Sequence, residues 1–249
     1  MAKQKGVVKL KGTIEDVSFY KSIDGYVARA KGGIDADRLK KDPKFSRTRE
    51  NNAEFGTAAK SAKLLRRALW PLLKRASDPR MIGRLVKLMT EIKNLDSVSA
   101  RGKRNVGLGI TNIQAPPILK NFEFNKNSEL GAVLQLIPEV NTATGEITVQ
   151  GFIPLEDLTA PVEATHVRFR GAWVKVNFAN GTRSIKYTNT MHLPIDAAQT
   201  DITLLPVATP AGTGLSMYVM MAAFFQEING IQYPLQNGVH NAMAIIEIA

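Results

Sequence analysis

The sequence predicts an α+β fold in which an N-terminal β-hairpin arm and a basic helical hairpin precede an all-β, immunoglobulin-like β-sandwich domain. Between residues 54 and 95, apolar residues recur every three or four positions, which is the period of a helix. After residue 116, about eight β-prone runs are separated by turn residues, a spacing typical of sandwiches. We therefore expect three regions: an N-terminal β arm (1–33), a basic helical region with a connector (34–115) and a β-sandwich domain (116–249).

The first thirty residues have the composition of short strands. The stretch VSFYKSIDGYVARAK places two β-prone runs around Asp24-Gly25, a strong signal for a tight turn. The preceding GVVKLKGTI is a third candidate strand, with Val8 and Leu10 on one face and lysines on the other. Gly32-Gly33 ends this region. Because three short lysine-rich strands make a poor core of their own, we expect them to complete a sheet in this subunit or in a neighbour.

A charged connector and two helices follow. The connector DADRLKKDPKFSRTRENN predicts a short helix that ends near Asp42-Pro43. The first long helix carries an apolar stripe from Ala58 to Leu73, and Pro71 should kink or restart it. The second has Asp78 as its N-cap, Pro79 at its first position and a stripe from Ile82 to Ile92. The two stripes predict a helical hairpin with apolar inner faces.

A glycine-rich stretch, SVSARGKRNVGLGITNIQAPP, has the composition of a hinge, and we place a domain boundary near residue 115. The remainder has the pattern of strands. The expected strands include LGAVLQLIP, ITVQGFIP, THVRFRGAWVKVNF, SIKYTN, DITLLPVATP, LSMYVMMAAFFQEI and HNAMAIIEIA. Asn180-Gly181 and Asn229-Gly230 predict tight turns. The run LSMYVMMAAFFQEI has the length of a helix, but flanking glycines and its aromatics favour a strand.

Alternation assigns faces to the strand THVRFRGAWVKVNF. The residues expected to point inward are Val167, Phe169, Val174, Val176 and Phe178. Those expected to point outward are Arg168, Arg170, Lys175 and Asn177. Phe122 and Phe124 likewise alternate with charged residues and predict a short strand.

Composition limits the classes of protein to which the chain can belong. Of its 249 residues, 44% are hydrophobic and 22% charged, which is ordinary for a globular protein. The absence of cysteine excludes disulfides, thiolate zinc sites and a cysteine nucleophile. The N-terminus lacks a signal-peptide apolar core, and no apolar run reaches the ~18 residues of a membrane span. We therefore expect a cytoplasmic protein, or one that forms part of an assembled particle.

The net charge of +11 is unevenly distributed. Residues 1–110 contain 26 Lys and Arg against 11 Asp and Glu, whereas residues 111–249 contain 7 against 11. This asymmetry favours either an anionic partner for the first half or head-to-tail attraction between subunits.

No catalytic or cofactor motif stands out. His166, His192 and His240 have no second ligand at metal-site spacing, and a loop that opens with a helical turn explains the Glu156-Asp157 pair. Neither a G-x-S-x-G motif nor a phosphate-binding or dinucleotide-binding glycine motif occurs. We therefore expect no enzyme activity, no catalytic residues, no metal and no cofactor, and no small-molecule substrate is evident.

Basic residues cluster on the two helices and the loop after them. The candidate polyanion-binding residues are Lys60, Lys63, Arg66, Arg67, Lys74, Arg75, Arg84, Lys87, Arg101 and Arg104. Such density suits phosphate binding, although a helix-turn-helix or RNA-binding signature is absent and few aromatic residues are interleaved. Two other interpretations stay open, namely a solvated helical face and electrostatic packing against the acidic half of a neighbour.

Two segments, KGTIEDVSFYKSIDGYVARAKGG and FSRTRENNAEFGTAAKSAKLLRRAL, resemble a family of uncharacterised bacterial proteins. That family shares the opening hairpin, the R-T-R-E-N-x-x-E-F-G block before a basic helix and a β-rich second half. The resemblance covers the first hundred residues most clearly. The resemblance implies a modular layout. Because the family has no assigned activity, the resemblance implies none for this chain.

The sequence as a whole favours a self-assembling structural subunit of a filament, shell or virion-like particle, with copies of itself as partners. Its N-terminal strands would join it to a neighbour by strand addition or arm exchange. The expected contact residues are Val8, Leu10, Phe19, Tyr20 and Val27. The alternative is a protein that binds nucleic acid without sequence specificity through the basic helical face.

Overall fold

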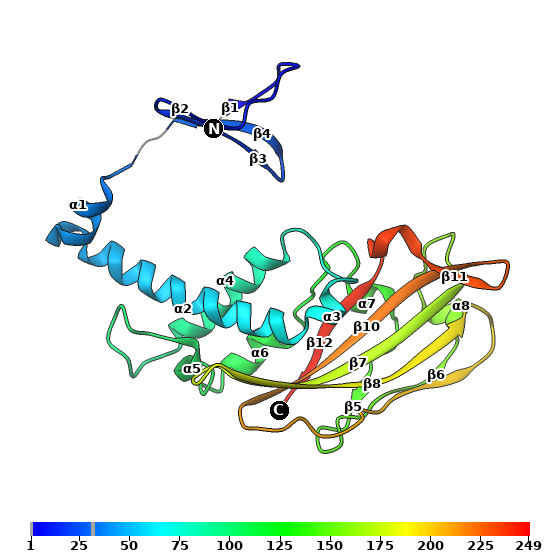
Figure 1. The fold of residues 1–249 in the computed structure, drawn as a ribbon. Coiled ribbons are helices and arrows are strands. Elements are labelled where there is room, and N and C mark those ends of the chain that lie inside the picture. Colours follow the sequence, from blue (N-terminus) through cyan, green and yellow to red (C-terminus); the bar gives the residue numbers. More distant parts are fainter. Residues whose placement is uncertain (1, 31–32) are drawn as a thin grey trace. The chain divides into compact units, whose positions relative to one another are not determined.

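The computed structural model describes residues 2–30 and 33–249 and divides the chain into two compact units, Met1–Asn51 and Asn52–Ala249 (Figure 1). The predicted α+β class is confirmed, because helices precede a strand-rich half made of antiparallel sheets. None of the described helices combines the length and the apolar character needed to cross a bilayer.

The first unit contains a four-stranded antiparallel sheet in the order β1-β4-β3-β2. Its strands are β1 (Ala2–Lys3), β2 (Gly12–Ile14), β3 (Val17–Ser22) and β4 (Gly25–Ala30). The turn predicted at Asp24-Gly25 is confirmed, since Ser22 pairs directly with Gly25. Gly32 of the predicted Gly32-Gly33 boundary lies outside the described residues.

The strand predicted for GVVKLKGTI is wrong over most of its length, because only its last three residues form β2. Val8 and Leu10 lie in the segment between β1 and β2. There the Gln4 side chain takes the place of a strand partner: Leu10 N donates to Gln4 Oε1 (2.9 Å), and Gln4 Nε2 donates to the Val27 carbonyl (3.1 Å). A single amide side chain thus satisfies backbone groups that a ladder would otherwise pair.

A short helix and a 3-10 turn follow in the same unit, α1 (Ala36–Lys41) and η1 (Pro43–Phe45). Asp35 caps α1 by accepting a hydrogen bond from Arg38 N (3.2 Å). The predicted end of the helix near Asp42-Pro43 is confirmed. The helix α2 (Ser46–Ala68) then runs from this unit into the second.

The second unit begins with helices that are buried along their apolar stripes. After α2 come α3 (Trp70–Leu73), α4 (Met81–Asn94), α5 (Val106–Gly109) and α6 (Ala115–Leu119). As expected from Pro71, α2 stops at Ala68 and the chain restarts as α3. Asp78 does not cap α4, which begins at Met81; its carboxylate instead accepts from Arg80 N (2.7 Å) and Lys126 N (3.0 Å).

Two antiparallel sheets complete the second unit (Figure 1). The larger contains β7 (His166–Asn177), β8 (Thr182–Pro194), β10 (Leu215–Ile228), β11 (Ile231–Pro234) and β12 (Ala242–Ile248). The smaller contains β5 (Glu139–Val140), β6 (Ile147–Phe152) and β9 (Thr200–Leu204). The turn α7 (Leu130–Val133) precedes β5, and the turns α8 (Pro154–Asp157) and η2 (Leu235–Gly238) lie between strands.

Both faces of the larger sheet are buried, and β10 shows how. Met217, Val219 and Met221 share a core with the helices, whereas Met220 and Ala222 share one with the smaller sheet. Burial on two faces explains why this strand is an almost unbroken apolar run instead of an alternating one. The strand predicted here is confirmed.

Burial on two faces also changes the predicted orientation of β7. β7 pairs with β10 in unbroken register, so its residues alternate between the two buried faces. Val167 and Phe169 face the smaller sheet, whereas Val174 and Val176 face the helices. The single inward face expected for this strand is wrong, because its apolar residues occupy both odd and even positions, and these lie on opposite faces.

Two segments expected to be strands are not. The stretch LGAVLQLIP contains the helical turn α7, and Phe122 and Phe124 flank an isolated bridge between Glu123 and Ala244. Both segments are apolar because they contribute buried side chains to the two cores. A short run of buried apolar residues does not by itself distinguish a strand from an irregular segment. The boundary expected near residue 115 falls inside the second compact unit.

Candidate assembly and polyanion surfaces

The N-terminal sheet has one apolar face, which the strand register defines. Gly12 and Ala28 both pair with Phe19, Ile14 pairs with Val17, and Lys21 pairs with Tyr26. Because paired residues and every second residue share a face, Phe19 lies on the same face as Ile14, Val17, Tyr26 and Ala28. Tyr20 and Val27 lie on the opposite face.

This apolar face has no covering layer within the first unit. Val27 is the one buried residue among the described residues of that unit, and it lies on the other face. Ile14 is 56% exposed, and Val17, Phe19 and Tyr26 are half-buried. A sheet ordinarily buries its apolar face against another element, so this face is incomplete as it stands.

Of the predicted assembly residues, Val8, Leu10 and Tyr20 are exposed, Phe19 is half-buried and Val27 is buried. The register therefore places Phe19 on one face and Tyr20 and Val27 on the other, although all three are expected to contact a neighbouring subunit. Alternation along β3 is the signal that could have distinguished them.

Carboxylates are exposed on the smaller sheet and on the segments that flank it. They are Glu139 on β5, Glu156 in α8, Glu163 before β7 and Asp201 on β9. Large apolar side chains are exposed in the same segments of the chain, namely Ile137, Leu155, Val162, Leu205 and Val207. Exposed apolar groups together with negative charge are typical of a surface that contacts a cationic partner.

A cationic groove of about 460 Å³ lies beside the C-terminal end of α2. Lys63, Arg66 and Arg67 line it together with Trp70 at the start of α3 and Arg183 on β8. Trp70 is 54% exposed, with Lys74 Nζ 5.6 Å from its ring centroid. The structure thus adds an aromatic residue and a distant arginine to the predicted basic helix. Trp70 was visible in the sequence, but the contribution of Arg183 depends on tertiary packing.

The remaining predicted polyanion residues divide into two groups. The exposed residues, which lie on the helices or in the segments after them, are Lys60, Lys74, Arg75, Lys87 and Arg101. Arg84 forms an ion pair with Asp78 and donates a hydrogen bond to the Glu123 carbonyl (2.6 Å). Arg104 forms an ion pair with Glu54. These last two guanidinium groups already join parts of the second unit, so we do not include them in a candidate interface.

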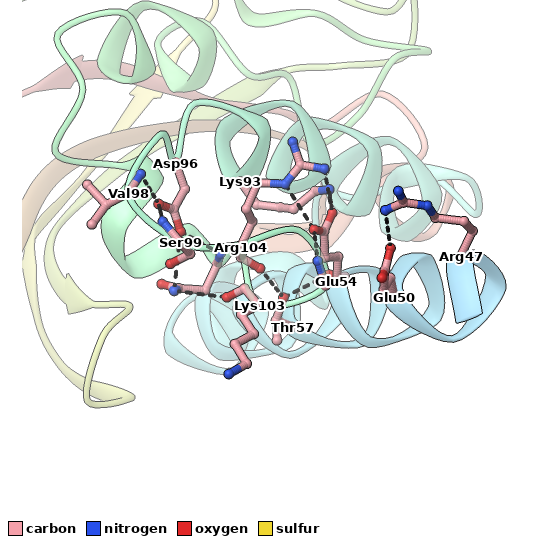
Figure 2. A network of polar contacts seen from close by, with 12 residues as sticks. Arg47, Glu50, Glu54, Thr57, Lys93, Asp96, Val98, Ser99, Lys103 and Arg104 are labelled. Carbon is pink, nitrogen blue, oxygen red and sulfur yellow. Dashed lines mark hydrogen bonds and ion pairs between the residues drawn. The ribbon is translucent and has the colours of Figure 1, made fainter. Parts of the chain in front are cut away.

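Figure 2 shows the network that holds Arg104. Glu54 of α2 is 2% exposed and forms ion pairs with Lys93 of α4 and with Arg104 (Nε to Oε1, 2.9 Å). Its Oε1 also accepts from Gly102 N (2.7 Å). The hydrogen bond from Arg104 is the largest influence and lowers the pKa of Glu54 to about 2, although burial raises it. One carboxylate thereby joins two helices and a loop.

The loop after α4 is fixed by a second buried carboxylate. Asp96 is 4% exposed and accepts hydrogen bonds from Val98 N (3.1 Å), Ser99 N (3.0 Å) and Asn105 N (3.1 Å). Burial alone would raise the pKa of Asp96, but the hydrogen bonds from Ser99 and Asn105 outweigh it and lower the pKa. The stretch with the composition of a hinge is therefore internally bonded.

The other residues considered for chemistry have local partners. Asp157 Oδ2 accepts from Ile153 N (2.7 Å) and closes the turn α8, and His166 Nε2 lies 3.5 Å from Glu227. Among the described residues, no three His, Asp or Glu side chains gather closely enough to hold a metal ion. Glu156 and Asp157 are the last two residues of this turn.

Comparison of the chain with protein families, with curated proteins and with solved structures finds no match. Function therefore has to be inferred from the surfaces of this chain itself.

Proposed function

We propose that the protein is a self-assembling structural subunit, joined through the apolar face of its N-terminal sheet. The observation that carries this proposal is the sheet's lack of a core: among the described residues of the first unit, Val27 alone is buried. Small sheets with an uncovered apolar face are marginally stable in water, so binding a partner surface would stabilise this one.

The occupant we propose for this face is the acidic outer surface of the smaller sheet in a second copy. Two lysines lie at this face, since the Nζ atoms of Lys11 and Lys21 are 6.0 and 5.7 Å from the Tyr26 ring centroid. The smaller sheet and the segments beside it expose carboxylates and apolar side chains. Contact between two different surfaces is head-to-tail and generates rings or filaments. We also propose that the two packed sheets have the immunoglobulin-like connectivity that the sequence predicts.

The test is the mass of the particle in solution, by light scattering on protein freed of nucleic acid. We expect full-length protein at high concentration and low salt to exceed the 27.3 kDa of one chain. Phe19→Ser should return it to that mass, because it removes a large apolar side chain from the apolar face. Tyr20→Ser is the matched control, since it deletes a neighbouring aromatic ring from the opposite face.

Wild-type protein that remains at 27.3 kDa under these conditions would contradict the proposal. Equal loss of assembly in both serine variants would show that the sheet has unfolded and that its apolar face is not the specific contact. Deletion of residues 1–31 then provides an independent check, because the second unit has its own two cores and should stay folded and monomeric.

A second function, the binding of single-stranded nucleic acid without sequence specificity, is favoured by the cationic groove. Lys63, Arg66, Arg67 and Arg183 supply charge for phosphates, and exposed Trp70 supplies a ring on which a base can stack.

Arg183→Glu is expected to lower affinity for a single-stranded oligonucleotide about tenfold and to reduce the salt dependence of binding, because a phosphate contact is lost. Fluorescence anisotropy over a range of salt concentrations measures both. Lys186→Glu is the matched control: it makes the same charge change on the opposite face of β8. If the two variants lower the affinity equally, the oligonucleotide responds to the net charge of the protein and not to the groove.

A further inference from the structure

A second group of arginines lies on the helix-facing side of the larger sheet, apart from the groove. Arg168 and Arg170 are two residues apart on β7, so they share a face. Met221 on β10 pairs with Arg170 and belongs to the core that the helices cover. On the other side, Thr190 and His192 of β8 pair with Arg170 and Arg168. These side chains are therefore brought to one place by strand register.

Together with α3 and the residues after it, these side chains line a half-open cavity of about 380 Å³. Its lining residues are Pro71, Leu72, Arg75, Arg168, Arg170, Thr190, His192 and Met221. A cavity of this size is at the lower end of the range for small-molecule sites, and it combines apolar walls with a few polar groups in the usual way.

Aromatic rings fix the two β7 arginines in place. The Arg168 guanidinium carbon lies 4.0 Å from the Phe225 ring centroid, and that of Arg170 lies 4.6 Å from the Tyr187 centroid. The Nε atoms of both arginines are buried and have no hydrogen-bond partner within the described part of the chain. Stacking therefore orients these planar cations but leaves hydrogen-bonding capacity unused.

The cavity carries positive charge that the protein itself does not neutralise. Among the described residues, no carboxylate forms an ion pair with Arg75, Arg168 or Arg170. Burial, followed by the charges of Arg75 and Arg170, lowers the pKa of Arg168. Like charges gathered in a partly dry site destabilise the fold unless an anion joins them.

We propose that this cavity binds a phosphate monoester group, with Arg75, Arg168 and Arg170 as its cationic ligands. Guanidinium groups match the geometry of phosphate oxygens and donate two parallel hydrogen bonds, and Thr190 and His192 supply further polar groups at the same wall. The cavity is larger than one phosphate, so it also has room for part of the molecule that carries the group. This inference does not depend on assembly or on the groove beside α2.

The test compares the melting temperature of wild-type protein with that of Arg168→Met, using inorganic phosphate as the probe and sodium chloride at equal ionic strength as the reference. At about a hundred times the dissociation constant, phosphate should raise the melting temperature of wild-type protein by about 5 °C. Arg168→Met should lose this response yet melt higher than wild type in phosphate-free buffer, because like-charge repulsion is relieved and the apolar stem is kept.

Lys186→Met, which removes a cation that lines neither the cavity nor the groove, should keep the full phosphate response. No rise beyond that given by sodium chloride, or an equal rise in Arg168→Met, would overturn the proposal. If Arg168→Met fails to fold, Arg75→Met tests the same cavity from an exposed position outside the sheets.

Competition experiments distinguish the two sources of a phosphate monoester. Displacement of inorganic phosphate by glycerol 3-phosphate, but not by an oligonucleotide with a 5′-phosphate, assigns the site to small phosphorylated molecules. Displacement by that oligonucleotide, but not by the same strand with a 5′-hydroxyl, assigns it to nucleic-acid ends. Displacement by neither compound would contradict a monoester site.

Discussion

Replacing Glu54 by Gln is expected to lower the free energy of unfolding by about 3–5 kcal/mol, because the substitution leaves Lys93 and Arg104 without their buried counter-charge. The carboxylate is 2% exposed, so water cannot replace it. The substitution keeps the shape of the side chain, which separates the loss of charge from a packing defect. The unfolding midpoint in urea at pH 7 measures the effect.

Glu50→Gln is the matched control one turn earlier on α2. It removes the carboxylate of an exposed pair with Arg47 (2.9 Å), seen at the right of Figure 2, and should cost less than about 1 kcal/mol. Equal midpoints for wild type and Glu54→Gln would show that the buried network does not stabilise the fold.

The same network predicts a dependence on pH. The pKa of Glu54 is lowered from 4.5 to about 2 in the folded protein, so its contribution is complete above pH 4.5 and is lost as the pH falls toward 2. The difference in stability between wild type and Glu54→Gln should therefore shrink between pH 4.5 and pH 2. A difference that stays constant over this range would mean that the carboxylate titrates normally.

Local signals were sufficient to predict much of the secondary structure. Asn229-Gly230 forms the expected turn, with φ angles of 52° and 77° that only such residues adopt readily. Pro71 restarts the helix where its missing N–H requires it. Both features depend on a few neighbouring residues, so a single sequence contains the information for them.

Features set by distant partners could not be predicted in the same way. Both faces of β7 are buried, one by the smaller sheet and the other by the helices, and this burial depends on elements far away in the chain. The arginines expected to point outward into solvent instead line a cavity closed in part by Arg75, which is far away in the chain. Alternation gives the relative faces of neighbouring residues, but packing decides what each face meets.

Gly109 shows how composition can mislead about flexibility. Its stretch is glycine-rich, which predicts a hinge, but Gly109 is buried at the contact between α5 and α4. A Cβ atom there would lie 2.1 Å from the carbonyl oxygen of Ile92, which belongs to the backbone of α4. The glycine therefore permits the close approach of two helices instead of providing freedom of motion.

Gly109→Ala is accordingly expected to destabilise the protein by about 3 kcal/mol. The added Cβ would collide with the backbone of α4, and α4 cannot move away without losing its contacts with the core. Gly83→Ala, within α4 itself, is the matched control: nothing lies within 4 Å of the added Cβ, and it should stabilise the protein by about 0.5–1 kcal/mol. Urea unfolding of the two variants measures effects of opposite sign. If Gly109→Ala is as stable as Gly83→Ala, then α4 and α5 do not pack this closely, and residues 97–110 are the hinge that their composition predicts.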